Sequence, residues 1–310
     1  MADDQLTIAD LVGNTFDISS AEVSDLLEDA PLVARLPVQM SSKGDTHKYV
    51  KVTQSPVVGF RAENAGRDFD HSVSELVTVT LKLIDYSWRV DKGNADVWLK
   101  GPQDLIATEG KRHLAAALFH LEKQIISGTG ADSGGFAGLA DDAGLNAVAD
   151  TMVVDGGGTG SDTTSVYALR VGEEDVSLVM RGDVPMSLGE TTVIDALDGS
   201  NKHYPAYYTP ACTWAGLQIG SAYSAGRIAN CETTGSSNII TDDKIFDLIS
   251  KFPAGRKPNL LVMNRTSQEL LRGGRTATNA TGAPAPIPEF VGGIPILVTD
   301  AITDTEAAIS

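Results

Sequence analysis

The sequence predicts an α+β protein organised around one long helix. Three stretches carry this prediction: a helical pattern over residues 101–130, an alternating strand pattern over 74–90, and a return to helix–strand alternation over 241–302. A hydrophobic content of 42% and a charged content of 21% are those of a folded protein. The 310 residues are enough for two or three domains with a substantial core.

Residues 1–40 predict an arm. Ser20 is placed to cap a short helix, and Pro31 is expected to end it. The next ten residues, PLVARLPVQM, are apolar and read as extended. Because so short a segment cannot fold alone, Leu32 and Val33 are expected to lie either on this chain's own core or on a neighbouring subunit.

Residues 41–90 predict a long hairpin. The outgoing limb HKYVKVTQ and the return limb SELVTVTLKLIDYSWRV both alternate between apolar and polar residues. The connection over 57–73 carries charges of both signs together with Phe60 and Phe69. A connection this long inside a compact domain is unusual and commonly functional. It is expected to reach outward, and the alternative is a disordered surface loop.

The pattern over 101–130 predicts a single helix of about 25 residues, roughly 37 Å long. Pro102 suits the first helical position, and Asp104 places negative charge in the first turn. An apolar stripe recurs every three or four residues: Ile106, Gly110, Leu114, Leu118, Leu121 and Ile125. The glycines at 128 and 130 are expected to end the helix. It is either a buried helix of an α+β enzyme or the spine of a flat, extended subunit.

After this helix the chain returns to strands. Residues 127–153 are rich in Gly and Asp and predict irregular structure, and residues 163–182 predict two strands around a Gly-Glu-Glu-Asp turn. Further strand candidates occupy 205–231.

The last seventy residues combine helices with buried strands. Thr241 opens a helix that Pro253 ends, and Thr266 opens another. Between them NLLVMN reads as a short buried strand of the kind found in parallel sheets. Residues 275–290 predict a loop, and VGGIPILVTDAI predicts a closing strand.

The residues do not form a recognisable catalytic or metal site. The sequence has no HExxH, no cysteine pair at zinc spacing and no Gly-x-Ser-x-Gly turn. His113 and His120 are two turns apart, too far to share a metal without a third element. No catalytic residue, cofactor or metal ligand is therefore predicted. Cys212 and Cys231 are expected as reduced thiols, with a disulfide as the alternative.

A net charge of −17 argues against a protein that grips nucleic acid, which needs a basic face. The longest apolar runs fall well short of the ~20 residues of a membrane span. The first ten residues, MADDQLTIAD, lack the order of a secretory signal, so a cytoplasmic product is expected.

Several of these stretches, taken in order, resemble the major capsid proteins of tailed bacteriophages. An arm, a long hairpin and a long helix ending in ISGTG are followed by KIFDLISKF, NLLVMNRTSQELLRG and FVGGIPILVTDAI. SVYALRVG and the segment 205–231 are similar to a subgroup of phage structural proteins. The resemblance covers most of residues 1–305 and lies in the order of the segments, since no single motif is specific.

The resemblance implies the Hong Kong 97-type fold. Its parts correspond to an N-terminal arm over 1–42, an E-loop hairpin over 43–80, and a P-domain over 81–234 whose spine helix covers 102–127. An A-domain core over 235–285, with a contribution from the preceding strands, and a closing strand with a tail over 286–310 complete the expectation.

The implied function is that of a shell protein, not an enzyme, which self-assembles through hexamers and pentamers into an icosahedral head around double-stranded DNA. Scaffolding, portal and decoration proteins are the other expected partners, with the virion as location after synthesis in the bacterial cytoplasm. Subunit contacts are expected at Phe60, Arg61, Phe69, Leu32 and Val33, because aromatic residues and Arg contribute disproportionately to interfaces. The alternatives are an encapsulin-type nanocompartment shell and a soluble α+β enzyme or ligand-binding protein.

Overall fold

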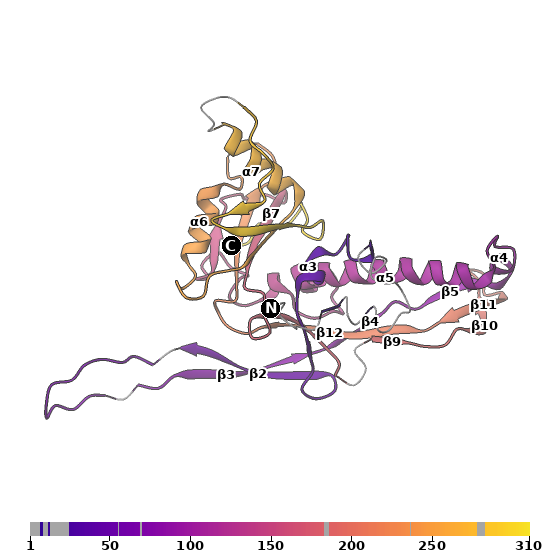
Figure 1. Ribbon diagram of the computed structural model, residues 1–310, viewed down its shortest axis with the longest axis horizontal. Helices are drawn as coiled ribbons and strands as arrows, with labels where there is room; N and C mark the ends of the chain where they lie inside the picture. The colour runs from indigo at the N-terminus through magenta and orange to yellow at the C-terminus, as the bar shows by residue number, and fades with distance from the viewer. Residues whose placement is uncertain are drawn as a thin grey trace.

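A computed structural model describes residues 7, 8, 12, 25–54, 56–68, 70–182, 186–235, 237–277 and 283–310. Figure 1 shows three parts: an elongated body that follows the long helix, a compact body that stands on it, and a hairpin that projects from one end. The strands of the described residues form four sheets.

The long helix α5 spans Pro102–Ser127, the range predicted for it. Pro102 lies in its first turn with Asp104, and the predicted apolar stripe is buried. Gly110 belongs to this stripe for a steric reason. A Cβ at Gly110 would lie 2.7 Å from Cζ2 of Trp88, so the absent side chain lets the indole ring lie against the helix.

Two sheets accompany α5 in the elongated body (Figure 1). The five-stranded sheet has the order β1-β8-β12-β4, with β9 also paired to β12, and the three-stranded sheet has the order β10-β11-β5. The strands are β1 (Val38–Met40), β4 (Lys82–Asp85), β5 (Trp88–Asp91), β8 (Val176–Met180), β9 (Met186–Leu188), β10 (Thr192–Leu197), β11 (His203–Thr209) and β12 (Ala211–Ile219). The short helix α4 (Lys92–Asp96) lies at the far end.

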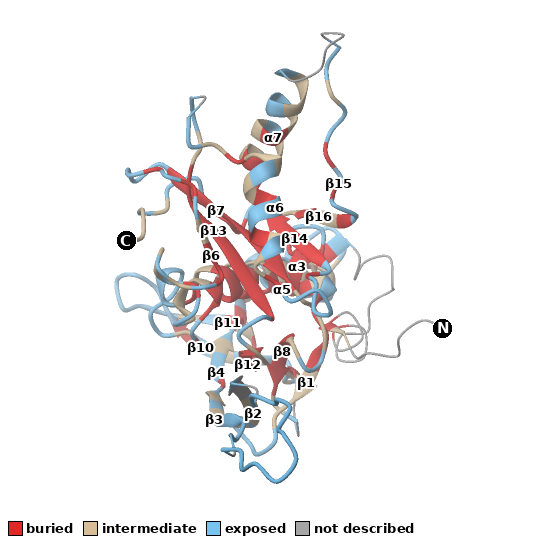
Figure 2. Ribbon diagram, turned by 90° about the vertical axis from the view of Figure 1, so that its left-hand side faces the viewer, coloured by how far each residue is buried: buried red, intermediate tan, exposed pale blue. Residues whose placement is uncertain are grey.

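The compact body contains a six-stranded sheet of order β15-β16-β14-β7-β13-β6. Its elements are β6 (Val153–Asp155), β7 (Thr163–Leu169), β13 (Ala225–Glu232), α6 (Asp242–Ser250), β14 (Leu260–Met263), α7 (Arg265–Ala277), β15 (Phe290–Val291) and β16 (Ile294–Val298). All seven residues of β7 are buried, and β14 runs parallel to β16, as predicted for NLLVMN. Figure 2 shows its strands β14, β7 and β13 as an almost continuously buried stretch.

The hairpin consists of β2 (Thr46–Gln54) and β3 (Val73–Thr80), which pair antiparallel from Thr46↔Thr80 to Gln54↔Val73. It projects away from both bodies (Figure 1). The described residues of its connection, 56–68 and 70–72, continue this projection.

The structure corrects several predictions about individual elements. Pro31 begins a helix, α3 (Pro31–Arg35), where an extended segment was predicted, because proline also fits the first helical turn. The predicted return limb over 74–90 is divided among β3, β4 and β5, which belong to three different sheets. β7 and β8 are both present, but they belong to different sheets and do not form a hairpin. Helix α7 continues to Ala277, into the predicted loop.

Candidate assembly surfaces

The root of the hairpin is fixed to strand β12. A ring nitrogen of His47 lies 2.8 Å from the side-chain oxygen of Gln218, and the Tyr49 hydroxyl donates to the carbonyl of Ile219 (2.9 Å). Burial raises the pKa of Tyr49. A Cβ at Gly216 would lie 2.8 Å from a methyl group of Leu81, so the backbone of β12 lies directly against this side chain, which follows β3. The root is therefore oriented by the body of its own chain.

Beyond the root, the hairpin leaves apolar side chains uncovered. Val50 and Leu76 are register partners on adjacent strands, and each is about three-fifths exposed (62% and 61%). Directly opposed side chains of a strand pair lie on the same face of the sheet. The pair forms an apolar patch that the described residues of its own chain leave uncovered.

The hairpin tip, here residues 56–68 and 70, is the most exposed apolar feature. Val57 is 66% exposed, Val58 is 83% exposed and Phe60 is completely exposed. Arg61 donates to the carbonyl of Ala65 (3.0 Å) and is otherwise at the surface. Of the three residues that the sequence singled out here, Phe60 and Arg61 are therefore accessible to another molecule. Phe69 lies outside the described residues.

The two arm residues that the sequence singled out lie elsewhere. Leu32 and Val33 are fully buried in α3, within the chain's own hydrophobic core. The arm was expected to lie either on the core of its own chain or on a neighbouring subunit. Residues 25–36 lie on their own chain. In this conformation a neighbouring subunit has no access to either side chain.

A single buried carboxylate joins the arm, the long helix and the compact body. One oxygen of Glu122 in α5 accepts hydrogen bonds from the backbone N–H groups of Leu32 (2.8 Å) and Val33 (3.1 Å), in the first turn of α3. The other oxygen accepts from the hydroxyl of Thr299, directly after β16. The Glu122 side chain is fully buried, and this burial raises its pKa above the ordinary value of 4.5, although all three hydrogen bonds act to lower it. All three donors are uncharged, which leaves desolvation as the dominant effect.

The backbone at the end of the long helix is closely packed against Gly138 and Asp141. Gly128 ends α5 with φ of +53°, and its amide donates to the carbonyl of Gln124. The Asp141 carboxylate accepts from the amide of Thr129 (2.7 Å) and from that of Gly138 (3.3 Å). A Cβ at Gly128 would lie 2.0 Å from an Asp141 oxygen. Both the positive φ and the close contact therefore require glycine here.

We predict that Gly128→Ala destabilises the subunit by about 2 kcal/mol or more, because alanine adds strain at positive φ and displaces Asp141. Gly130→Ala is the matched control. Its added methyl group would have its nearest neighbour at 4.0 Å, and its backbone has no positive φ. Urea unfolding of both variants tests the prediction, and equal midpoints would contradict it.

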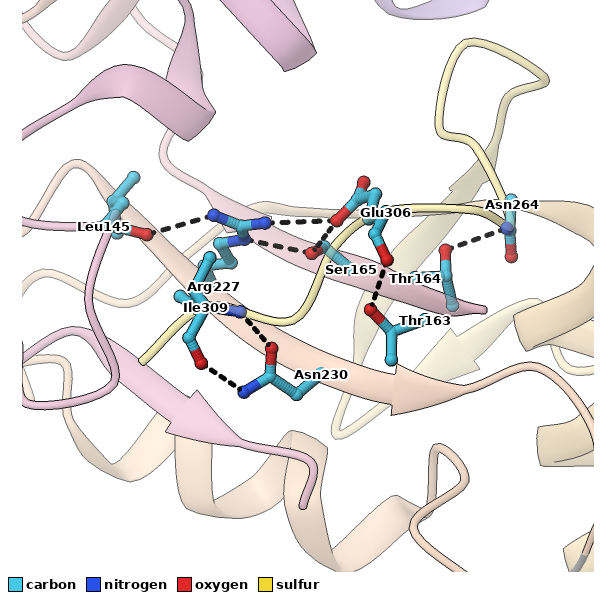
Figure 3. Close-up of polar contacts among 9 residues, drawn as sticks. All are labelled: Leu145, Thr163, Thr164, Ser165, Arg227, Asn230, Asn264, Glu306 and Ile309. Atoms are coloured by element: carbon cyan, nitrogen blue, oxygen red, sulfur yellow. Dashed lines mark hydrogen bonds and ion pairs between the residues drawn. The ribbon is translucent and has the colours of Figure 1, made fainter. Parts of the chain in front are cut away.

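The C-terminal tail is fastened across the compact body. Figure 3 shows the buried Arg227 guanidinium between Ser165 (2.9 Å) and the carboxylate of Glu306 (3.1 Å). Asn230 holds the backbone of Ile309 from both sides, accepting from its N–H (2.8 Å) and donating to its carbonyl (3.0 Å). The tail therefore supplies hydrogen-bond partners to side chains of β7 and β13, and residues 306–309 belong to the folded compact body.

A second exposed apolar surface lies at the far end of the elongated body. Val97 is 82% exposed and Leu99 is 99% exposed, in the loop between α4 and α5. Trp98, between them, is partly exposed and donates from Nε1 to the Asp104 carboxylate (2.9 Å). The elongated subunit thus carries uncovered apolar side chains at both of its extremities (Figure 1).

The histidines and cysteines of the described residues are not gathered into a metal site. They contain no group of three or more His, Cys, Asp or Glu side chains placed to hold a metal ion. His113 stacks on Trp88, and His120 lies 3.5 Å from an Asp132 oxygen. Both cysteines are free, and burial raises the pKa of Cys231 to about 11. Among the same residues, none of the helices has the length and apolar character that crossing a membrane requires.

Comparison with known proteins agrees with this arrangement. Residues 17–310 match the model of the family described as major capsid protein GP7. A chain in the structure of bacteriophage Epsilon15 is 22% identical over 88% of this chain and 87% of its own, with a TM-score of 0.61. A chain of the bacteriophage JBD30 capsid decorated with minor capsid protein trimers is 15% identical over 87% of this chain and 89% of its own, with a TM-score of 0.52. Among curated proteins, none matches. The structural likenesses confirm the predicted α+β capsid fold.

Proposed function

The chain belongs to the family of major capsid protein GP7, and from this premise we propose that its copies form the icosahedral head of a tailed bacteriophage around double-stranded DNA. It is a structural protein and not an enzyme. The observation that carries the proposal is the family match over 17–310, taken together with a hairpin that leaves Val50, Leu76 and Phe60 uncovered by the described part of its own chain.

We assign the contacts between copies to the hairpin. A hairpin that leaves the body and exposes Val50, Leu76 and Phe60 is stabilised when a neighbour covers those side chains. Phe60 and Arg61 are the proposed anchors, since both are accessible and both types are enriched among residues that dominate interface energies. Phe69 remains a third proposed anchor in the same connection. Contacts of about 1,000 Å² or more per pair are expected of stable interfaces.

The sheet topology supports a revised division of the chain. We propose that the A-domain includes β6, β7 and β13 as well as the region 235–298, because all of these strands share the six-stranded sheet. The P-domain then comprises α5, the three-stranded sheet and strands β4, β8, β9 and β12 of the five-stranded sheet, to which β1 of the arm also pairs. We keep the arm over 1–42 and the E-loop over 43–80 as parts of the proposed division.

The remaining partners are proposals of the same kind. The copies are expected to form hexamers and pentamers, with scaffolding and portal proteins taking part in assembly in the bacterial cytoplasm. A JBD30 capsid is decorated with minor capsid protein trimers, which makes a decoration protein a reasonable partner here too. DNA is enclosed without sequence-specific binding, in keeping with the net charge of −17.

Electron microscopy of the protein purified from an expression host tests the proposal. We expect capsomers or closed particles of megadalton mass. A small, discrete oligomer under all assembly conditions would contradict it. Particles that package only a dedicated protein cargo would instead favour the nanocompartment alternative.

A further inference from the structure

The exposed tip of the hairpin is tied together by one arginine. Nη1 of Arg67 donates to the carbonyl of Gly59 (2.9 Å), and Nη2 donates to the carbonyl of Val57 (2.5 Å). The amide of Val57 in turn donates to the carboxylate of Asp70 (2.8 Å). These contacts join the segment before Phe60, at Val57 and Gly59, to the segment after it, at Arg67 and Asp70.

The guanidinium is suited to this task. Its planar group offers several N–H donors in a fixed fork, so a single side chain can hold two carbonyls at once. The carbonyls of Val57 and Gly59 lie ten and eight residues before Arg67, so the contact closes the loop across its width. Among the described residues, Arg61 of the same tip donates to the nearby carbonyl of Ala65 and forms no bridge between the limbs of this kind.

We propose that Arg67 is a positioning residue for shell assembly, which holds the tip in the shape that presents Val57, Val58 and Phe60 to a second copy of the chain. The inference rests on the proposed function. Ordering a loop on association opposes binding, and a loop that is already closed loses less entropy when it docks. Arg67 therefore acts through the apolar side chains that it positions.

Assembly of the full chain with Arg67→Ala tests this inference, with Arg112→Ala as the matched control. Arg112 is an exposed arginine of α5 outside the hairpin, so both variants change net charge equally. We expect Arg67→Ala to raise the critical concentration for assembly about fivefold, as expected for the loss of one or two exposed hydrogen bonds, and Arg112→Ala to change it less than about twofold. Arg67→Lys, which keeps the charge but not the fork, should recover only part of the loss.

Hydrogen exchange of the unassembled subunit supplies a second readout. Peptides covering 56–68 should exchange faster in Arg67→Ala than in the wild type, while the melting temperature is unchanged, because the tip is not part of the core. Unchanged exchange, or equal critical concentrations for the two alanine variants, would overturn the inference. If the wild-type chain forms no particles at all, the proposed function fails and the inference fails with it.

Discussion

Deletion of residues 58–72 is expected to leave a folded subunit that forms no shells. β2 and β3 remain paired as far as Gln54↔Val73, so residues 55–57 can close the shortened hairpin as a three-residue turn. The deletion removes Val58, Phe60 and the Arg67 contacts from a region whose described residues lie outside the hydrophobic core. The melting temperature should stay within about 2 °C of the wild-type value.

Analytical ultracentrifugation at concentrations where the wild type assembles provides the measurement. A variant in which residues 58–68 are replaced by the same number of Gly and Ser residues separates hairpin length from side-chain contacts. Both variants should sediment as unassembled subunits or small oligomers. Particles of wild-type size from the deletion would show that the tip is dispensable.

Replacement of Glu122 by alanine is expected to destabilise the subunit by about 3 kcal/mol or more. The change leaves two backbone N–H groups of α3 and the Thr299 hydroxyl without their acceptor in a buried site. Since Glu122 in α5 links these groups of the arm and of the compact body, the arm should detach from both. Chemical unfolding measures the first effect, and limited proteolysis within residues 25–42 measures the second.

Two further variants make this prediction specific. Glu122→Gln keeps an oxygen for Leu32 and Val33 and an amide that can donate to Thr299, so it should retain most of the wild-type stability. Glu109→Ala removes an acid from the same helix, but one in an ion pair with the exposed Arg112, and should cost less than about 1 kcal/mol. Equal losses for Glu122→Ala and Glu109→Ala would contradict the account.

The raised pKa of Glu122 also fixes the sign of a pH dependence. The folded state binds the proton of the Glu122 carboxyl group more tightly than the unfolded state does. The resulting contribution to the stability of the fold is therefore fully present below pH 4.5. It is lost as the pH rises through the raised folded-state pKa. Glu122→Gln cannot titrate and should lack this component of the pH–stability profile.

The long helix could be predicted to the residue because its signals are local. Pro102 sets its start, and Gly128, with its positive φ, sets its end. The projecting hairpin was likewise predictable from alternation and from the length of its connection. Elements of this kind are determined by residues that are neighbours in sequence.

The pairing of distant strands could not be predicted in this way. The continuous β pattern over 74–90 gives no sign that it divides among three sheets, because the partners β12 and β11 lie more than a hundred residues away. The helix at Pro31 depends on an acceptor, Glu122, that lies ninety residues later. The one available signal was a glutamate among the apolar residues of α5, a position that calls for a buried partner.

The contacts made by Phe60 in assembled particles test the central claim most directly. The claim is that the hairpin finds its cover on sister copies. Replacement of Phe60 by the photoreactive residue p-benzoylphenylalanine, followed by irradiation of particles and a denaturing gel, reports what lies beside this position. The account predicts covalent products at twice the subunit mass. Cross-links confined to the monomer band, from position 60 to its own chain, would contradict it.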